Sequence, residues 1–219
     1  MSDSGSTRPG LIIVVSAPSG GGKTSLCQKL LNWSPHLVYS VSCTTRPPRA
    51  GEEHGREYFF LTSEEFDKKI AANEFLEHAK YNRYCYGTPR RFVEQELAAG
   101  RDVLLDIEVQ GAAAIAQRVR NGGFAYPEAL VQIFLMPPSM DLLEQRLRRR
   151  ATDDDTTIKR RLKIAEQEMG HWRDYDYIIV SGPLDDDFEQ AKSIVIAEKR
   201  KTQRFPKDFK QWQQNTLSF

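Results

Sequence analysis

The chain has 219 residues, of which 40% are hydrophobic and 28% are charged, and its formal net charge is +1. This length suits one core domain with inserted subdomains, and the balanced charge excludes a global basic field for nucleic acid or membranes. No apolar run approaches the roughly 18 residues of a membrane span, and the three cysteines show neither C-x-x-C spacing nor a disulfide framework. Because the N-terminus is polar and lacks the apolar stretch of a signal peptide, we expect a cytoplasmic protein.

The first predicted elements are a buried strand over residues 11–15, a glycine-rich loop over residues 16–25 and a helix over residues 24–33. The loop reads Ser-Ala-Pro-Ser-Gly-Gly-Gly-Lys-Thr-Ser. Its glycines let backbone N–H groups surround an anion, Lys23 can reach the β- and γ-phosphates of a nucleotide, and the Thr24 hydroxyl can ligate Mg²⁺. The alternative, a glycine-rich turn with an incidental lysine, does not explain the helical spacing of the leucines that follow.

One position departs from the usual phosphate-loop pattern. The pattern G-x-x-x-x-G-K-[ST] has a glycine where this chain has Ala17. The loop therefore forms only if this residue does not need a positive φ. On that condition, we expect nucleotide phosphates to contact Ala17, Pro18, Ser19, Gly20, Gly21, Gly22, Lys23, Thr24 and Ser25.

Residues 43–88, which follow a candidate strand at 37–42, do not continue the alternation of strands and helices. Their turn signals and aromatics predict a small mixed α/β insertion with an antiparallel sheet. Within it, Arg46 and Arg49 stand three apart beside two prolines, which suits a clamp for a phosphate. Tyr58 and Tyr86 can donate phenolic O–H groups to the same phosphate. The alternative is a solvated turn with two surface arginines.

The next strand, Val-Leu-Leu-Asp-Ile over residues 103–107, carries an acid near its carboxyl end. In a parallel sheet that end binds ligands, so Asp106 can organise Mg²⁺ directly or through water. Glu108 faces the same side as Asp106 if the strand continues that far. The alternative is that Asp106 caps the following helix.

The remaining elements alternate in the same way, with helices at 89–99, 110–121, 139–150 and 185–200 and strands at 131–136 and 177–180. This order predicts an α/β fold with a doubly wound parallel sheet. Residues 146–161 are highly charged, and we expect an exposed mobile segment between helices. Basic residues on both of its flanks suit a lid over transferring phosphates. The alternatives are a solvated helix face or a nucleic-acid patch, and the neighbouring acids disfavour the patch.

Taken together, these motifs resemble the guanylate kinase family of nucleoside monophosphate kinases. The resemblance rests on the phosphate loop, Val-Ser-Cys-Thr-Thr-Arg-Pro-Pro-Arg-Ala-Gly-Glu, Gly-Arg-Glu-Tyr-Phe-Phe, Asn-Glu-Phe-Leu-Glu, Tyr-Gly-Thr, Leu-Asp-Ile-Glu-Val-Gln-Gly and Arg-Leu-x-x-Arg. They run in the family's order over residues 11–200. The combination is highly specific, although the phosphate loop alone is not.

The resemblance implies roles for particular residues. It implies guanine contacts for Ser42, Glu77, Thr88 and Glu108, with Gly87 in the same GMP-binding segment. It implies that Arg46, Arg49, Tyr58 and Tyr86 hold the GMP phosphate. It implies that Lys23, Arg46, Asp106, Arg146, Arg150 and Arg161 are catalytic, with Mg²⁺ at Thr24 and Asp106. Two departures are Ala151 and Ser181-Gly182, where the family often has glycine and Asn-Asp.

The resemblance also implies an organisation and a reaction. The chain divides into a flexible N-terminus (1–9), core (10–42), GMP-binding insertion (43–88), core (89–145), lid (146–161), core (162–204) and polar tail (205–219). The implied reaction is ATP + GMP, or dGMP, giving ADP + GDP, or dGDP, with Mg²⁺ and without nucleic acid or membrane partners. The oligomeric state stays open. The other classes to weigh are a catalytically inactive phosphopeptide-binding module of the same fold and a phosphotransferase acting on another small phosphate.

Overall fold

The computed structural model describes residues 8–81, 83–149 and 154–205. Its larger sheet has five parallel strands in the order β2-β7-β1-β8-β9. The strands are β1 (Ile12–Ser16), β2 (Leu37–Tyr39), β7 (Asp102–Asp106), β8 (Leu130–Met136) and β9 (Tyr177–Val180). Because β1 and β7 are neighbours, with Val15 opposite Asp106, the carboxyl ends of both strands meet at one edge. The predicted α/β fold with a parallel sheet is confirmed.

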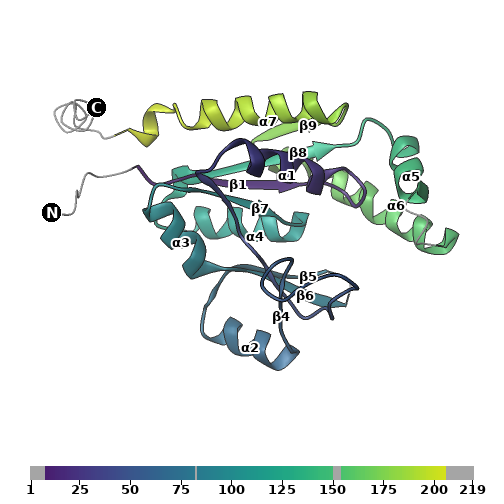
Figure 1. Cartoon of the computed structure of the whole chain (residues 1–219), viewed down its shortest axis with the longest axis horizontal. Helices are drawn as coiled ribbons and strands as arrows, with labels where there is room; N and C mark the ends of the chain where they lie inside the picture. The colour runs from purple at the N-terminus through teal and green to yellow at the C-terminus, as the bar shows by residue number, and fades with distance from the viewer. Residues whose placement is uncertain (1–7, 82, 150–153, 206–219) are drawn as a thin grey trace.

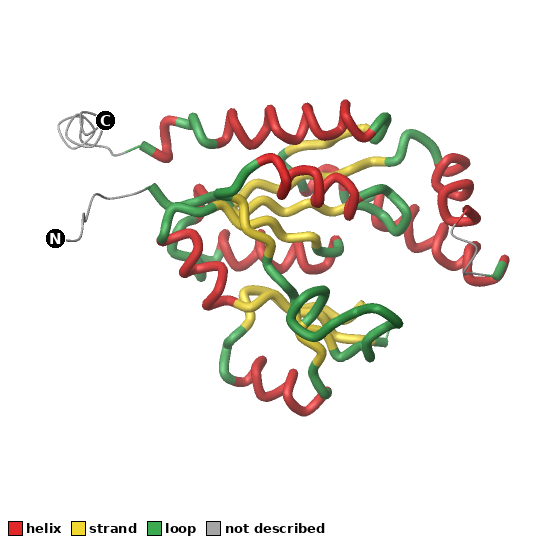
Figure 2. Tube along the Cα trace, in the orientation of Figure 1, coloured by secondary structure: helices red, strands yellow, loops and turns green. Residues whose placement is uncertain are grey.

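Helices cover both faces of this sheet (Figures 1 and 2). One layer contains α1 (Lys23–Trp33) and α7 (Leu184–Glu198), and the other contains α3 (Arg90–Ala98) and α4 (Val109–Arg120). Strand alternation explains the two layers, because Ile13 and Val15 pack with the first pair of helices while Ile12 and Val14 pack with the second. The sheet is therefore buried on both faces, as expected for parallel strands with continuous apolar runs.

A second sheet lies beside the larger one and belongs to residues 43–89 (Figure 1). Its elements are β3 (Cys43–Thr44), β4 (Phe59–Phe60), α2 (Ser63–Ala71), β5 (Phe75–Tyr81) and β6 (Tyr84–Pro89). The strand order is β4-β3-β6-β5. Its small core contains Cys43, Phe66 and Phe75. The expected antiparallel sheet is thus mixed, because β3 pairs with β4 in parallel and with β6 antiparallel.

The charged segment differs more from its expectation. Residues 146–149 end α5 (Met140–Arg149), in agreement with the helix predicted at 139–150. Residues 155–161 begin α6 (Asp155–Met169), so the expectation that they lie between helices is wrong. The Asp154 side chain caps α6 by accepting the Thr157 N–H at 2.7 Å, and Ile158 and Ala165 bury one side of the helix. Residues 150–153, which include Arg150 and Ala151, lie outside the described residues.

Three short 3₁₀ turns complete the described secondary structure, at Pro127–Ala129, Trp172–Asp174 and Thr202–Arg204. Among the described helices, not one combines the length and apolar character needed to span a lipid bilayer.

Candidate active site

The loop between β1 and α1 has the backbone of an anion-binding loop. Gly20 and Gly22 have φ values of 93° and 99°, in the left-handed region that glycine adopts without strain. Of the non-glycine residues described, only Asn73 has a positive φ, so Ala17 does not need one. A Cβ on Gly21 would lie 2.9 Å from the Ala17 Cβ, which shows how tightly the loop closes. The departure at Ala17 therefore leaves the loop intact.

Lys23 is the first residue of α1, and two carboxylates already hold its side chain. Its Nζ lies 2.8 Å from Asp106 Oδ1 and 3.4 Å from Glu108 Oε1, and it donates to the Ile107 carbonyl at 3.2 Å. Burial by itself lowers the pKa of Lys23, but Glu108 and Asp106 outweigh burial and the pKa lies above its ordinary value. The lysine is thus a fixed cation at the carboxyl ends of β1 and β7.

Glu108 reaches the site by a different route from the one expected. Strand β7 ends at Asp106, so the condition that Glu108 continue the strand is not met. Glu108 instead stands at the N-cap of α4, where its side chain makes no capping hydrogen bond. One of its oxygens pairs with Lys23, and the other, Oε2, is buried without a hydrogen-bond partner among the described residues. The carboxylate therefore keeps an unused acceptor beside Lys23.

The first turn of α1 is open to an anion. It contains no acidic residue, and Thr24 and Ser25 are exposed there. The positive end of the helix dipole adds to the charge of Lys23. A hydroxyl at Thr24 and a carboxylate at Asp106 are oxygen donors of the kind that Mg²⁺ binds.

Two arginines from α5 and α6 touch the phosphate loop. Arg146 Nη1 donates to the Gly21 carbonyl at 3.4 Å and to Ser181 Oγ at 3.3 Å. Arg161 Nη2 donates to Ser19 Oγ at 2.6 Å. Two of the three arginines expected near the transferring phosphate thus lie at the loop, and Arg150 falls outside the described residues.

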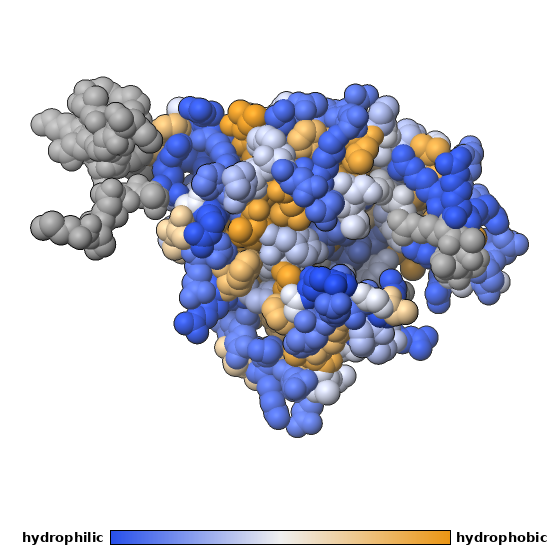
Figure 3. Space-filling model, viewed as in Figure 1, coloured by the Kyte–Doolittle hydropathy of each residue, from blue (hydrophilic) through white to orange (hydrophobic). Residues whose placement is uncertain are grey.

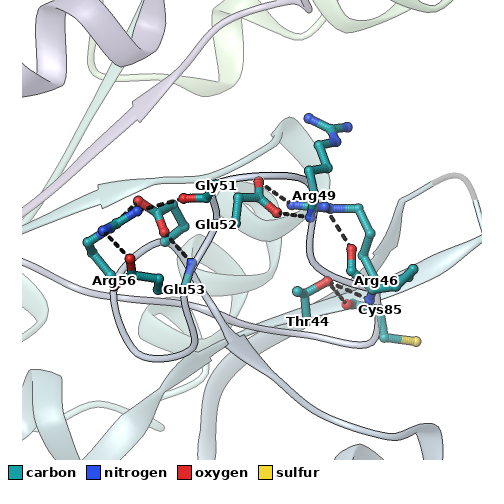
Figure 4. A network of polar contacts seen from close by, with 10 residues as sticks. Thr44, Arg46, Arg49, Gly51, Glu52, Glu53, Arg56 and Cys85 are labelled. Carbon is teal, nitrogen blue, oxygen red and sulfur yellow. Dashed lines mark hydrogen bonds and ion pairs between the residues drawn. The ribbon is translucent and has the colours of Figure 1, made fainter.

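The insertion holds a second cationic group, at Arg46. The residue is 9% exposed, and its side chain lies over the Tyr58 ring, with the guanidinium carbon 5.4 Å from the ring centroid. The Tyr58 and Tyr86 rings meet edge to face at 5.9 Å. Figure 4 shows the Arg46 guanidinium within a polar network, whereas the exposed Arg49 side chain points away from it. Arg46 is therefore buried, unlike an arginine of a solvated turn.

Two strands of the insertion bury a carboxylate against a hydroxyl. Glu77 on β5 lies opposite Thr88 on β6, and Thr88 Oγ1 donates to Glu77 Oε1 at 2.6 Å. Glu77 is 6% exposed, and burial raises its pKa to about 7 despite the hydrogen bond from Thr88, which lowers it. Gly87 is buried in the same sheet, opposite Cys43 on β3, and Ser42 is buried directly before that strand. A Cβ on Gly111 of α4 would lie 2.9 Å from Glu77 Oε2, so α4 packs directly against this carboxylate.

Electrostatics links the insertion to the phosphate loop. Burial is the largest cause of the raised pKa of Tyr58, but Asp106 also raises that pKa and Lys23 lowers it. Both charged groups at the ends of β1 and β7 therefore act electrostatically on the Tyr58 hydroxyl.

Figure 3 shows mainly hydrophilic residues on α5 and α6, the pair of helices that carries Arg146 and Arg161.

The sequence analysis missed Glu168, a buried acid on α6. The residue is 3% exposed, and neither carboxylate oxygen has a hydrogen-bond partner among the described residues. Burial, and to a smaller extent the nearby Glu108, raises its pKa to about 7. The Tyr175 hydroxyl is likewise buried without a partner there. The available signal was the helical spacing of Ile158 and Ala165 after Asp154, which predicts α6 and a buried face.

Comparisons with known proteins agree with this geometry. The family model described as guanylate kinase matches residues 9–198. A guanylate kinase of Paramagnetospirillum magneticum is 44% identical over 90% of this chain and 89% of its own length, and one of Rhodopseudomonas palustris strain BisB5 is 46% identical over 91% and 88%. The crystal structure of guanylate kinase from Anaplasma phagocytophilum covers 90% of both chains with a TM-score of 0.71 at 36% identity.

Proposed function

Since this chain belongs to the guanylate kinase family, we propose that it transfers the γ-phosphoryl group of ATP to GMP, and also to dGMP, giving ADP and GDP or dGDP. The observation that carries this proposal is a pair of sites in one fold. A phosphate loop with a fixed lysine lies at the sheet edge, and a buried carboxylate paired with a hydroxyl lies in the insertion. The first suits a phosphoryl donor, and the second suits a base with two N–H donors.

On the donor side, residues Ala17 to Ser25 hold the ATP phosphates. The left-handed glycines turn backbone N–H groups toward the anion. Lys23 exchanges part of its contact with Asp106 and Glu108 for the β- and γ-phosphates. Arg146 and Arg161, already at the loop, stabilise the charge on the transferring group together with Arg150.

On the acceptor side, Arg46, Arg49, Tyr58 and Tyr86 hold the GMP phosphate, and Ser42, Glu77, Gly87, Thr88 and Glu108 surround the guanine. Guanine offers N1–H and 2-NH₂ donors, which an ionised Glu77 accepts. Its O6 and N7 accept hydrogen bonds from hydroxyls such as Ser42 and Thr88. No covalent intermediate and no catalytic base are needed, because phosphoryl transfer depends on alignment and charge neutralisation.

Mg²⁺ fits the residues present. Thr24 would hold it through its hydroxyl and Asp106 through its carboxylate, directly or by way of water. When bound with ATP, the metal supplies charge neutralisation at the β- and γ-phosphates. The cytoplasmic location stays a prediction.

The second candidate class, a phosphopeptide-binding module without catalysis, is not favoured. Such a module has no need for the phosphate loop and Asp106, and here Lys23 and Asp106 form a close pair. The third class, a phosphotransferase for another small phosphate, differs from a guanylate kinase in the acceptor that it prefers.

The test is an acceptor panel. We expect purified protein with ATP and Mg²⁺ to convert GMP and dGMP to their diphosphates, with kcat/KM for AMP, CMP and UMP lower by about 10⁴. ADP release and chromatographic identification of the product are the measurements. Turnover with another monophosphate at a rate equal to that with GMP would favour the third class, and no turnover with any would favour the binding module.

A further inference from the structure

Glu52 lies at the centre of the polar network around Arg46 (Figure 4). Its Oε1 is 2.8 Å from Arg46 Nη2, and its Oε2 accepts the backbone N–H of Arg49 at 2.7 Å. The backbone N–H of Glu52 in turn donates to the Arg49 carbonyl at 3.1 Å. One carboxylate therefore contacts both the Arg46 guanidinium and the backbone of Arg49, the two arginines proposed to hold the acceptor phosphate.

Other contacts fix Arg46 on its remaining sides. Nη1 donates to the Pro47 carbonyl at 2.9 Å, and the backbone N–H donates to Thr44 Oγ1 at 3.1 Å. The Tyr58 ring covers the guanidinium at 5.4 Å. An arginine side chain loses rotamer freedom when it is fixed. This network orders the side chain before any substrate arrives.

The neighbouring ion pairs of the same segment show a different pattern. Arg56 pairs with Glu53 at 2.9 Å and with Glu57 at 2.6 Å, and the Arg56 and Glu53 side chains are more than half exposed. The side chains of Arg46 and Glu52 are 10% and 17% exposed. Exposed pairs contribute little to stability, whereas a shielded, hydrogen-bonded pair holds its geometry. The hydrogen bond from Arg46 also lowers the pKa of Glu52, so the carboxylate stays ionised at neutral pH.

We propose that Glu52 is a positioning residue for the acceptor phosphate: its carboxylate orients the Arg46 guanidinium and fixes the backbone of Arg49, so that the remaining Arg46 donors face the phosphate of GMP. Glu52 does not touch the substrate and acts through Arg46. This inference rests on the proposed function and adds to it the group that preorganises the phosphate clamp.

The test compares Glu52→Gln with a matched control, Glu57→Gln. The amide that Glu52→Gln introduces has one acceptor oxygen, so it cannot serve both Arg46 and the Arg49 N–H, and its NH₂ opposes a donor. Glu57 also accepts a backbone N–H, that of Glu53 at 2.8 Å, and pairs with an arginine, but its arginine is not Arg46. Thermal unfolding of both variants checks that the fold is kept.

We expect Glu52→Gln to raise KM for GMP by about tenfold or more, the effect of losing one charge-assisted hydrogen bond, while Glu57→Gln leaves it unchanged. The KM for ATP and the inhibition constant of guanosine, which lacks the phosphate, should stay within about twofold of wild type. In an Arg46→Ala background, adding Glu52→Gln should change KM for GMP little, because the group that Glu52 orients is gone. If Glu52→Gln does not fold, Glu52→Asp keeps the charge but shortens its reach, and we expect an intermediate rise.

Three outcomes would overturn the proposal. The first is an equal KM for GMP in the two glutamine variants. The second is a lower KM for GMP in Glu52→Gln than in wild type, which would mean that Glu52 occupies the position of the phosphate. The third is a guanosine inhibition constant that weakens as much as GMP binding does. A wild-type protein that does not phosphorylate GMP would instead count against the proposed function.

Discussion

Lys23 is paired with Asp106 and Glu108. This arrangement avoids an unpaired buried ammonium, which would be costly, and it keeps the side chain at the sheet edge where phosphates arrive. The same pairing explains why Lys23 is expected to matter so much for binding of the phosphoryl donor, ATP. Removing the lysine leaves two neighbouring acids facing the position of the ATP phosphates.

Lys23→Ala should therefore reduce kcat by about 10²-fold or more, while calorimetry should find GMP binding largely unchanged. Lys29→Ala is the control, because Lys29 lies on the same helix and pairs with the exposed Asp185. We expect that control to retain wild-type turnover. A Lys23→Ala protein with most of the wild-type rate would contradict the assignment of the phosphate loop.

Burial of Glu77 predicts a pH dependence of acceptor use. Its pKa of about 7 means that part of the free enzyme carries a neutral carboxyl at neutral pH. A neutral carboxyl cannot accept both guanine donors, so kcat/KM for GMP should fall about tenfold per pH unit below 7. Glu77→Gln should have a low kcat/KM for GMP and should lose this part of the pH profile. Ionisation of the GMP phosphate itself remains in the variant and serves as the internal control.

The raised pKa of Glu77 also affects stability, and here low pH is favourable, whereas it is unfavourable for the use of GMP. The folded-state pKa of Glu77 lies above its ordinary value, so the folded protein binds the proton more tightly than the unfolded chain does. This stabilisation is full below about pH 4.5 and is lost as the pH rises through about 7. Free enzyme with Glu77→Gln should therefore show a smaller fall in unfolding free energy between pH 5 and pH 8, measured by urea titration. An identical pH dependence of the unfolding free energy in wild type and variant would show that burial does not raise the pKa of Glu77.

At the scale of elements, helix α4 joins the two halves of the site. Its N-cap residue, Glu108, lies beside Lys23, and Gly111 in its first turn packs against the Glu77 carboxylate of β5. A side chain at position 111 would meet the end of Glu77, not a backbone atom, so the carboxylate and not the helix is expected to move.

Gly111→Ala should thus separate stability from recognition. Alanine stabilises a helix by about 0.5–1 kcal/mol relative to glycine, so the unfolding temperature should be unchanged or slightly raised. The displaced Glu77 should lower kcat/KM for GMP by about tenfold or more, as expected when a buried hydrogen bond is lost, with KM for ATP unaltered. Unchanged GMP kinetics would mean that the carboxylate accommodates the methyl group without losing its position.

How much of the structure the sequence predicts differs from element to element. The central strands β1, β7 and β8 of the larger sheet are buried on both faces. Apolar runs locate all five strands, although β2 ends three residues earlier and β7 one residue earlier than expected. The pairing of β3 with β4 could not be predicted, because two-residue strands carry no periodic pattern. Helix α6 was missed because charge dominates its first turns, although Asp154 and Ile158 mark its start and its buried side.

The site was predictable to the extent that local motifs define it. The phosphate loop and Arg46 lie within short segments of characteristic spacing. Glu52 could not be assigned a role in this way, because its contact with Arg46 exists only in the folded chain. Strand alternation placed Glu108 on the side of Asp106 only if the strand continued that far, whereas its N-cap position on α4 brings it to Lys23.

At the scale of the whole molecule, the acceptor groups and the donor loop belong to separate packing units. Glu77 and Thr88 lie on the smaller sheet, which has its own core, and Arg46 follows its strand β3. Asp106 ends β7 of the larger sheet, and Lys23 begins α1 beside it. The α5 and α6 helices carry Arg146 and Arg161 from a third direction (Figure 1). In-line transfer requires the two phosphates to approach closely, and water must be excluded to prevent hydrolysis of ATP.

We therefore expect the insertion and the α5–α6 pair to move toward the core when both nucleotides bind. Small-angle scattering of the free protein and of a complex with an adenosine–guanosine oligophosphate checks this. The radius of gyration should fall toward the value of about 17 Å for a compact chain of this length. ATP alone and GMP alone are the controls, and each should give a smaller decrease than the bisubstrate compound, because each contacts fewer of the three parts. Glu77→Gln should weaken the response to GMP without altering the response to ATP. Superimposable profiles with and without the bisubstrate compound would show that the free arrangement is already the reactive one.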